Sequence, residues 1–296
     1  MTAEEAERLR AFFDAFPGAE RPYLLLDYDV TLAPFRLDRF LARPWAGVRG
    51  LLDQIRRQGR THLAVVTGRS AHEIAPLLGL DPPLEVWGLH GAEHLFPDGR
   101  RELELAAGAA RAKLEELRTQ LNRDSFGGRF EDKANGVVMH WRGASQRKAR
   151  LIERRTRALF EPAARTEGLS LLEFEAGVEL RVGRDKGEAV KTILLDANPD
   201  TPVAYLGDDL TDEPGFRAVN RVGMRGLSVL MRRQRRETEA DIWLRPPAEL
   251  RQFLRMWLTA SAESSQEIPL KRTRTRSRKT SPALLEEPEL AFSAKA

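Results

Sequence analysis

The sequence predicts an α/β protein in which a parallel sheet forms the core and a smaller α+β module is inserted into it. Short apolar runs alternate with helical patterns toward both ends of the chain, which is the rhythm of parallel βαβ units. Between about residues 103 and 182 the pattern changes to hairpins alternating with long helices. We therefore expect a core domain formed by residues 1–102 and 183–258, with residues 103–182 as a separate module.

The first part of the predicted core alternates helices and strands. A helix begins after Thr2, whose spacing to Glu5 is that of a capping box. The next elements are a strand at Tyr23–Leu26, a helix at Pro44–Gln58 ended by Gly59, a strand at His62–Val66, a helix capped by Ser70 and a strand at Leu84–Trp87. Apolar runs of this length are typical of strands that are buried on both faces of a parallel sheet.

The inserted module is predicted to contain two helices and two hairpins. Helical patterns cover Glu102–Leu121 and Ser145–Phe160. The dipeptides Asn135-Gly136 and Ala176-Gly177 lie between extended arms, and such pairs favour tight hairpin turns. The module is therefore an α+β unit, distinct from the core.

The core pattern resumes with a helix at Lys186–Leu195 and a strand at Val203–Leu206. Beyond Leu258 the chain becomes polar and basic, so we expect residues 259–296 to form a disordered tail. The run from Lys271 to Thr280 carries six basic residues and no aromatic residue. This composition favours a solvated tail over a nucleic-acid-binding segment.

The composition excludes several classes of site. The chain has 296 residues, no cysteine, 42% hydrophobic residues and a formal net charge of +4. Disulfides, thiolate metal sites and a cysteine nucleophile are therefore excluded. No stretch is long and apolar enough for a membrane span, and the acidic amphipathic N-terminus argues against a signal peptide. We expect a cytoplasmic protein with no membrane partner.

Polar residues suited to one chemical task follow the predicted strands or begin a predicted helix. They are Asp27 with Asp29, Thr67, Lys186, and Asp208 with Asp212. Ligands of open α/β sheets bind outside the carboxyl ends of the strands. Carboxylates are hard oxygen ligands suited to Mg²⁺, and one carboxylate can attack phosphorus while another moves the proton. Thr hydroxyl and Lys ammonium groups stabilise a transferring phosphoryl group. Each motif is common in turns, but their order makes coincidence improbable.

Six segments together resemble the haloacid dehalogenase-type phosphatases and, within them, the trehalose-6-phosphate phosphatase family. They are DYDVTLAPF, VVTGRS, GLHGAE, FEDKANGVVMHWR, VELRVGRDKG and LGDDLTDE, over about residues 20–250. The resemblance implies a haloacid dehalogenase-like Rossmannoid core with a parallel sheet, and an inserted cap domain that closes over the substrate. It also implies Mg²⁺-dependent hydrolysis of trehalose 6-phosphate through an aspartyl-phosphate.

The resemblance also implies residue roles. Asp27 would be the nucleophile, Asp29 the general acid/base, and Thr67 and Lys186 would hold the phosphoryl oxygens. The metal would be bound by Asp27, the Asp29 backbone carbonyl and Asp208, with Asp212 supporting them. The disaccharide would contact Arg69, His90 and Gly91 of the core and Glu131, Lys133, Glu179 and Arg181 of the cap. Without the resemblance, Glu131 and Lys133 would be interpreted as a surface ion pair of a hairpin.

One departure bears on activity, because Val30 stands where the family usually has glycine. A β-branched residue adopts glycine-type backbone angles only at a cost, which predicts a stiffened or displaced loop around Asp29. Two alternatives therefore stay open: a related capped phosphatase acting on another sugar phosphate, and a catalytically weak phosphosugar-binding or regulatory protein. An association with a trehalose-6-phosphate synthase is also left open.

Overall fold

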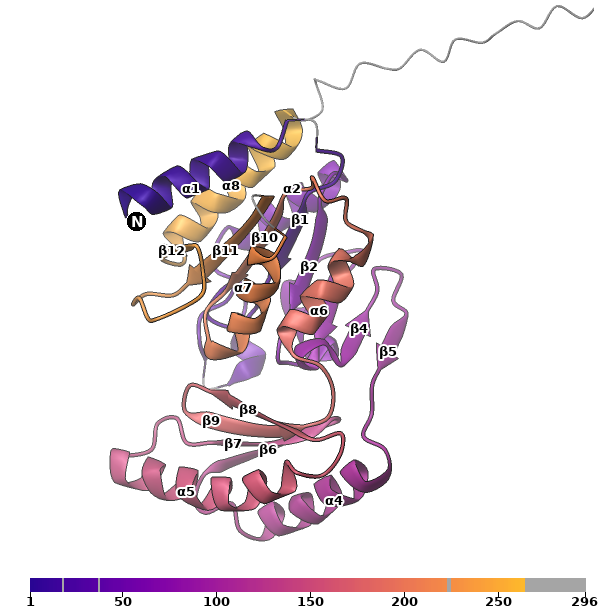
Figure 1. Ribbon diagram of the computed structural model, residues 1–296, viewed down its shortest axis with the longest axis vertical. Helices are drawn as coiled ribbons and strands as arrows, with labels where there is room; N and C mark the ends of the chain where they lie inside the picture. The colour runs from indigo at the N-terminus through magenta and orange to yellow at the C-terminus, as the bar shows by residue number, and fades with distance from the viewer. Residues whose placement is uncertain (18, 37, 223–224, 264–296) are drawn as a thin grey trace, which may run out of the picture.

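The computed structural model describes residues 1–17, 19–36, 38–222 and 225–263, which form a larger core and a smaller cap (Figure 1). The core contains a mainly parallel sheet and the cap a separate antiparallel one. The predicted fold class is therefore confirmed. In the described part of the chain, no helix combines the length and apolar character needed to cross a membrane.

The core sheet has eight strands in the order β12-β11-β10-β1-β2-β3-β4-β5. Their bounds are β1 Tyr23–Leu26, β2 His62–Val66, β3 Glu85–Gly88, β4 Glu93–Leu95, β5 Arg101–Leu103, β10 Val203–Gly207, β11 Gly226–Met231 and β12 Ile242–Leu244. Strand β1 pairs in parallel with both β10 and β2. The carboxyl ends of these three strands consequently meet at one edge of the sheet, where the ligand of an open α/β sheet binds.

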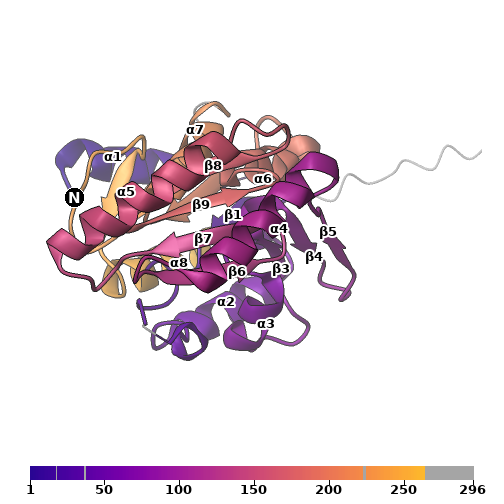
Figure 2. The same cartoon turned by 90° about the horizontal axis from the view of Figure 1, so that it is seen from below.

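Helices cover both faces of the core sheet (Figure 2). They are α1 Ala3–Asp14, α2 Val48–Gln58, α3 Ala71–Leu78, α6 Lys186–Ile193, α7 Glu213–Asn220 and α8 Ala248–Glu263, with short 3₁₀ turns η1 Arg39–Leu41, η2 Leu89–Gly91, η3 Leu194–Asp196 and η4 Leu210–Asp212. Side chains of β1 alternate between the two layers: Leu24 joins the apolar cluster under α1, α2, α3 and α8, and Leu25 joins the one under α6 and α7. The sheet is thus buried on both sides, as the apolar runs predicted.

The cap is a four-stranded antiparallel sheet in the order β6-β7-β9-β8, covered by two helices. Its elements are α4 Gly108–Arg123, β6 Arg129–Lys133, β7 Gly136–His140, α5 Gln146–Ala163, β8 Ser170–Phe174 and β9 Gly177–Arg181. Both predicted hairpins are present, and the helices lie on the face of the sheet that points away from the core (Figure 1). The bare face of the cap sheet therefore looks toward the strand ends of the core.

Three predicted boundaries were wrong. The second helix begins at Val48 rather than Pro44, because Gly47 precedes it with a left-handed φ of 83°. The cap helix begins at Gly108 rather than Glu102, because Glu102 pairs with His94 in an antiparallel hairpin that the sequence analysis missed. Helix α8 continues to Glu263, past the predicted start of the tail at residue 259. The rest of the predicted tail, including the basic run, lies outside the described residues.

Candidate active site

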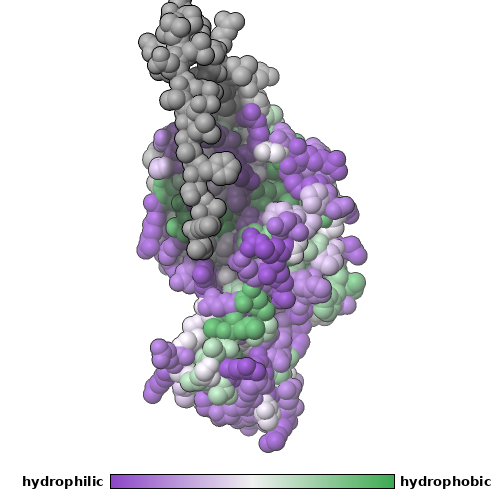
Figure 3. Space-filling model, turned by 90° about the vertical axis from the view of Figure 1, so that its right-hand side faces the viewer, coloured by the Kyte–Doolittle hydropathy of each residue, from purple (hydrophilic) through white to green (hydrophobic). Residues whose placement is uncertain are grey.

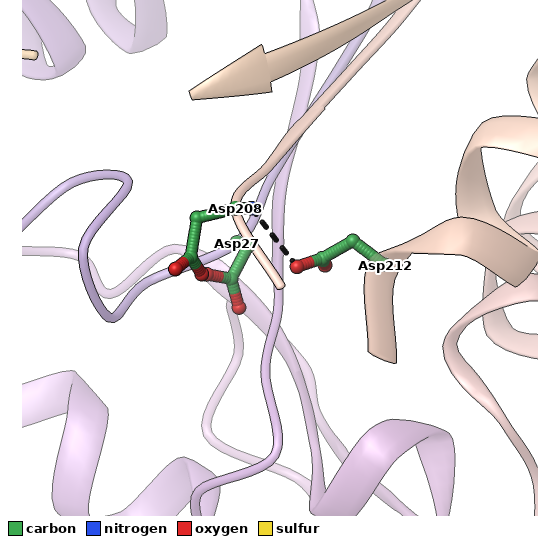
Figure 4. Close-up of side chains that lie close together, drawn as sticks. All are labelled: Asp27, Asp208 and Asp212. Atoms are coloured by element: carbon green, nitrogen blue, oxygen red, sulfur yellow. Dashed lines mark hydrogen bonds between the residues drawn. The ribbon is translucent and has the colours of Figure 1, made fainter. Parts of the chain in front are cut away.

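Three carboxylates meet at the carboxyl edge of the core sheet (Figure 4). Asp27 follows β1, Asp208 follows β10, and Asp212 ends the turn η4; each offers an oxygen within 4.8 Å of the others. Asp27 and Asp212 are buried and Asp208 is half-buried. Burial and repulsion from the neighbouring carboxylates raise the pKa of Asp208 well above its usual range.

Lys186 supplies one positive charge to this cluster. It begins helix α6, where Asp185 caps the helix and Glu188 completes a capping box. Its Nζ lies 2.6 Å from Asp27 Oδ1 and 2.7 Å from Asp212 Oδ1. Burial raises the pKa of Asp27, and the Lys186 ammonium opposes that shift. Lys186 therefore favours the ionised form of Asp27, the carboxylate to which the family resemblance gives the role of nucleophile.

Asp212 positions its neighbours rather than facing the cleft with free oxygens. Its Oδ1 accepts hydrogen bonds from Lys186 and from the Tyr205 hydroxyl, the latter at 2.5 Å. Its Oδ2 accepts from the backbone N–H groups of Asp208 and Asp209, each at 3.0 Å. Since all of its acceptor capacity is in use, Asp212 serves to hold Lys186 and the Asp208 loop in place.

The chemistry of the donor set fits a divalent cation. Asp27 and Asp208 are hard oxygen donors beside each other, and one lysine cannot neutralise three clustered carboxylates. Mg²⁺ typically uses one or two protein carboxylates together with substrate phosphate and water. The pair Asp27 and Asp208 therefore suits such an ion better than a set of three direct carboxylate ligands would.

The loop after β1 carries Asp29 into the cleft. The Thr31 N–H bonds the Asp29 carbonyl at 2.7 Å and closes a three-residue turn around Val30, whose φ is 62°. The backbone strain predicted for Val30 is therefore present. The side chain of Asp29 is 42% exposed toward the cleft, yet the surrounding protein desolvates it enough to raise its pKa. A raised pKa favours the protonated form that a general acid needs.

Of the other predicted site residues of the core, Thr67 and Arg69 line the cleft and Gly91 does not. Thr67 follows β2 and lines the same cleft as Asp27, and its side chain accepts a hydrogen bond from the Arg69 N–H. Arg69 lies 3.5 Å from Asp29 Oδ1 and 3.2 Å from Glu73, and also lines the cleft. Gly91 has a φ of 106° and packs so closely on Ala189 that an added Cβ would come within 2.8 Å. It does not line the cleft, so its position has a packing explanation.

The cap residues of the prediction form a buried charged network over the cleft. Lys133 Nζ lies 2.8 Å from Glu179 and donates to the Gly68 carbonyl of the core at 3.0 Å. His90 Nε2 of the core lies 3.6 Å from the same carboxylate. Lys133 and His90 favour the ionised form of Glu179, whose pKa is lowered despite its burial. These three side chains all line the cleft.

Two further cap residues differ in their relation to the cleft. Glu131 lines it and pairs with His140 at 2.8 Å and with Arg39 of the core. Arg181 is buried behind this layer, donates to the Arg184 carbonyl and is absent from the cleft lining. The structure therefore brings Glu131, Lys133 and Glu179 together at the cleft, but not Arg181.

The residues that the sequence analysis did not predict for this region include Arg39, Phe35 and Tyr205. Arg39 joins Glu73 of the core to Glu131 of the cap, and Phe35 lines the cleft mouth. Only Tyr205 had a local signal, because a tyrosine in an aliphatic buried strand needs a partner for its hydroxyl group. The contacts of Arg39 and Phe35 depend on where the cap sits, which their neighbours in sequence do not encode.

Comparisons with known proteins give one consistent result. A profile of the trehalose-phosphatase family matches residues 25–245. The chain is 33% identical over 247 residues to the trehalose-phosphate phosphatase of Mycobacterium marinum, covering 79% of this chain and 60% of that relative. The chain thus spans less than two thirds of that relative's length.

Two solved structures share the fold. The C-terminal domain of the C. albicans trehalose-6-phosphate phosphatase matches with a TM-score of 0.71 at 20% identity, over 88% of this chain and 97% of that one. A phosphatase of the haloalkanoate (HAD) enzyme superfamily from Bacteroides thetaiotaomicron matches with a TM-score of 0.53 at 18% identity, over 81% and 95% of the two chains. Both likenesses concern the arrangement of core and cap as a whole.

Proposed function

The chain belongs to the trehalose-phosphatase family of the haloacid dehalogenase-like superfamily, and we propose that it hydrolyses trehalose 6-phosphate to trehalose and phosphate. The observation that carries the proposal is the cluster of Asp27, Asp208, Asp212 and Lys186 at the base of a cleft between core and cap. The same cleft is lined by charged cap side chains able to bind sugar hydroxyls. A phosphorylated disaccharide requires both features.

In this proposal Asp27 is the nucleophile and Asp29 moves the proton. An oxygen of Asp27 bonds to phosphorus while the bond from phosphorus to the sugar oxygen breaks, and Asp29 gives its proton to that leaving oxygen. Asp29 then takes a proton from water, the water oxygen bonds to phosphorus, and the Asp27 carboxylate is released. Thr67 and Lys186 bind the phosphoryl oxygens and stabilise the charge that develops on them.

Asp27 and Asp208, with the Asp29 backbone carbonyl, would hold Mg²⁺. When bound, the ion would supply positive charge that offsets the phosphate and the clustered carboxylates. The cap would exclude water while Glu131, Lys133 and Glu179 bind the sugar hydroxyls.

Phosphate release from a panel of sugar phosphates tests the proposal. Each assay would be run with Mg²⁺, with EDTA, with Asp27→Asn and with Asp98→Asn, a matched carboxylate exposed on the β4–β5 turn. We expect release from trehalose 6-phosphate that depends on Mg²⁺, is lost in Asp27→Asn and persists in Asp98→Asn. Preferential release from another sugar phosphate would keep the chemistry and reject the substrate.

A second candidate is a protein that binds the phosphosugar but turns it over weakly. The strained φ of 62° at Val30, next to the proposed acid Asp29, favours it. Binding of trehalose 6-phosphate without phosphate release under all conditions would support this candidate over the phosphatase.

A further inference from the structure

The mouth of the cleft contains an aromatic side chain with no assigned role. Phe35 follows the loop that carries Asp27 and Asp29, lines the same cleft, and remains 47% exposed. Leaving a large aromatic ring in contact with water has a cost that a ligand can recover by covering it. Neither a phosphate group nor a cation held by the carboxylates would cover the apolar surface of this ring.

Cap residues add apolar and aromatic groups to the cleft that Phe35 lines. The guanidinium of Arg142 lies 4.9 Å from the centroid of the Phe35 ring and also lines the cleft. Phe174 and Val138 of the cap sheet line it too. The cleft lining thus offers two aromatic rings and a methyl-bearing side chain together with the planar guanidinium of Arg142.

The chemistry of this part of the cleft lining matches a sugar ring. A pyranose has hydroxyls at its rim and C–H groups on its faces, so it pairs an apolar face with an aromatic ring while its rim binds polar donors. Pockets for small molecules commonly combine apolar walls with a few placed polar groups. The charged network of Glu131, Lys133 and Glu179 suits the hydroxyl rim, and Phe35 suits the C–H face.

Resting on the proposed function, we propose that Phe35, with Arg142 over its ring, binds the second, unphosphorylated sugar ring of the disaccharide. Phe35 is then a specificity-determining residue that distinguishes a disaccharide phosphate from a monosaccharide phosphate. A monosaccharide phosphate would have no second ring to cover Phe35.

The turn η1, five residues further along the chain, provides a matched control. Phe40 is also exposed, at 60%, and also has an arginine over its ring, with the Arg39 guanidinium 5.5 Å from its centroid. It does not line the cleft. Phe35→Ala and Phe40→Ala therefore remove the same group from two nearby positions, one inside the cleft and one outside it.

The test measures kcat/KM for trehalose 6-phosphate and for glucose 6-phosphate, and takes the ratio as the preference for the disaccharide. Phe35→Ala should lower this preference about tenfold, equivalent to ~1.4 kcal/mol, mainly through KM for trehalose 6-phosphate. Phe35→Tyr should restore most of it, and Phe40→Ala should leave it at the wild-type value. An unchanged preference in Phe35→Ala, or an equal fall in Phe40→Ala, would overturn the inference.

Calorimetric binding of the same two ligands separates this inference from the proposed function. If the wild type releases no phosphate, the phosphatase proposal fails, but the ratio of the two dissociation constants still tests Phe35 with the same expected tenfold change. If the enzyme releases phosphate normally but Phe35→Ala leaves the preference for the disaccharide unchanged, the aromatic subsite is rejected and the phosphatase proposal stands. Absence of both turnover and binding would overturn both proposals.

Discussion

Val30 has a backbone φ angle that its β-branched side chain disfavours. A β-branched residue with a φ of 62° is a strong outlier, and such strain costs about 1–3 kcal/mol. Val30→Gly removes the strain but adds freedom to the unfolded chain, which costs about 0.5–1 kcal/mol. We expect a net rise of about 1 kcal/mol in the free energy of unfolding, measured by urea titration.

The matched variant Val30→Ala keeps a Cβ in the left-handed region and removes only the β-branching. It should recover less stability than Val30→Gly. If strain at Val30 also displaces Asp29, Val30→Gly should raise kcat as well. A glycine variant less stable than the wild type would show that the turn is not strained.

His90 links the stability of the protein to pH. It is buried, and desolvation lowers its pKa to about 3, with Arg181 and Lys133 adding to the shift and Glu179 opposing it. Below its unfolded pKa of about 6.5, the unfolded chain binds a proton that native His90 does not. Stability contributed by neutral His90 is therefore present above that pH and falls on acidification, by about 2 kcal/mol between pH 6.5 and pH 5.

The test compares the denaturant midpoints of unfolding of the wild type and of histidine variants over this pH range. His90→Asn should lose less stability on acidification than the wild type, because asparagine does not titrate and tolerates the φ of 57° at this position. The control His72→Asn, at an exposed site, should follow the wild-type profile. A parallel pH profile for His90→Asn would contradict the assignment.

At the scale of elements, Trp257 is one of the side chains that join α8 to the core. This side chain is fully buried, packs edge-on against Phe16 at 4.9 Å between ring centroids, and donates from Nε1 to Thr61 Oγ1 at 3.0 Å. Trp257→Ala should lower the free energy of unfolding by about 3–5 kcal/mol, as for other buried aromatic truncations. Trp257→Phe should lose less. Chemical denaturation checks both, and a loss below 1 kcal/mol for alanine would indicate that α8 is not part of the cooperative core.

The elements that the sequence predicted best were those with unbroken apolar runs. Strand β1 was assigned residue for residue, because Tyr23–Leu26 lies between turn signals and is buried on both faces. The β4–β5 hairpin was missed because its strands are short and polar. The burial of Glu93 involves tertiary contacts with Ser70, the Ala71 N–H and Arg101, which the local sequence does not encode. Positions of the carboxylates followed from the strand ends, whereas the contacts of Phe35 depend on the docked cap.

At the scale of the molecule, polar contacts join the cap to the core. The described apolar residues form separate clusters, and none of these clusters spans both units. The view in Figure 3 shows the two units above and below a narrower junction. Polar inter-domain contacts of this kind permit relative motion of the units. A cap held in this way can move away from the core to admit substrate, while the apolar cluster of each unit stays intact.

Salt should therefore shift the cap toward an open form. The contacts of Arg39 with Glu131 and of Arg232 with Glu175, the latter at 3.6 Å, are partly exposed ion pairs. Such pairs contribute about 0–1 kcal/mol each and are screened by salt, whose Debye length falls to about 3 Å at 1 M. We expect the radius of gyration from small-angle X-ray scattering to increase between 0.05 M and 1 M NaCl.

Variants connect this expected change to the named ion pairs. Arg39→Ala with Glu175→Ala should increase the radius of gyration already at low salt and remove most of the further response to salt. Arg57→Ala, which removes an exposed ion pair with Asp53 on α2, should respond as the wild type does. If the radius is the same at both salt concentrations, the contacts of Lys133 with the Gly68 carbonyl and of Glu179 with His90 hold the cap closed on their own. In that case substrate entry would require breaking these contacts, and Lys133→Ala would be the variant that opens the cap.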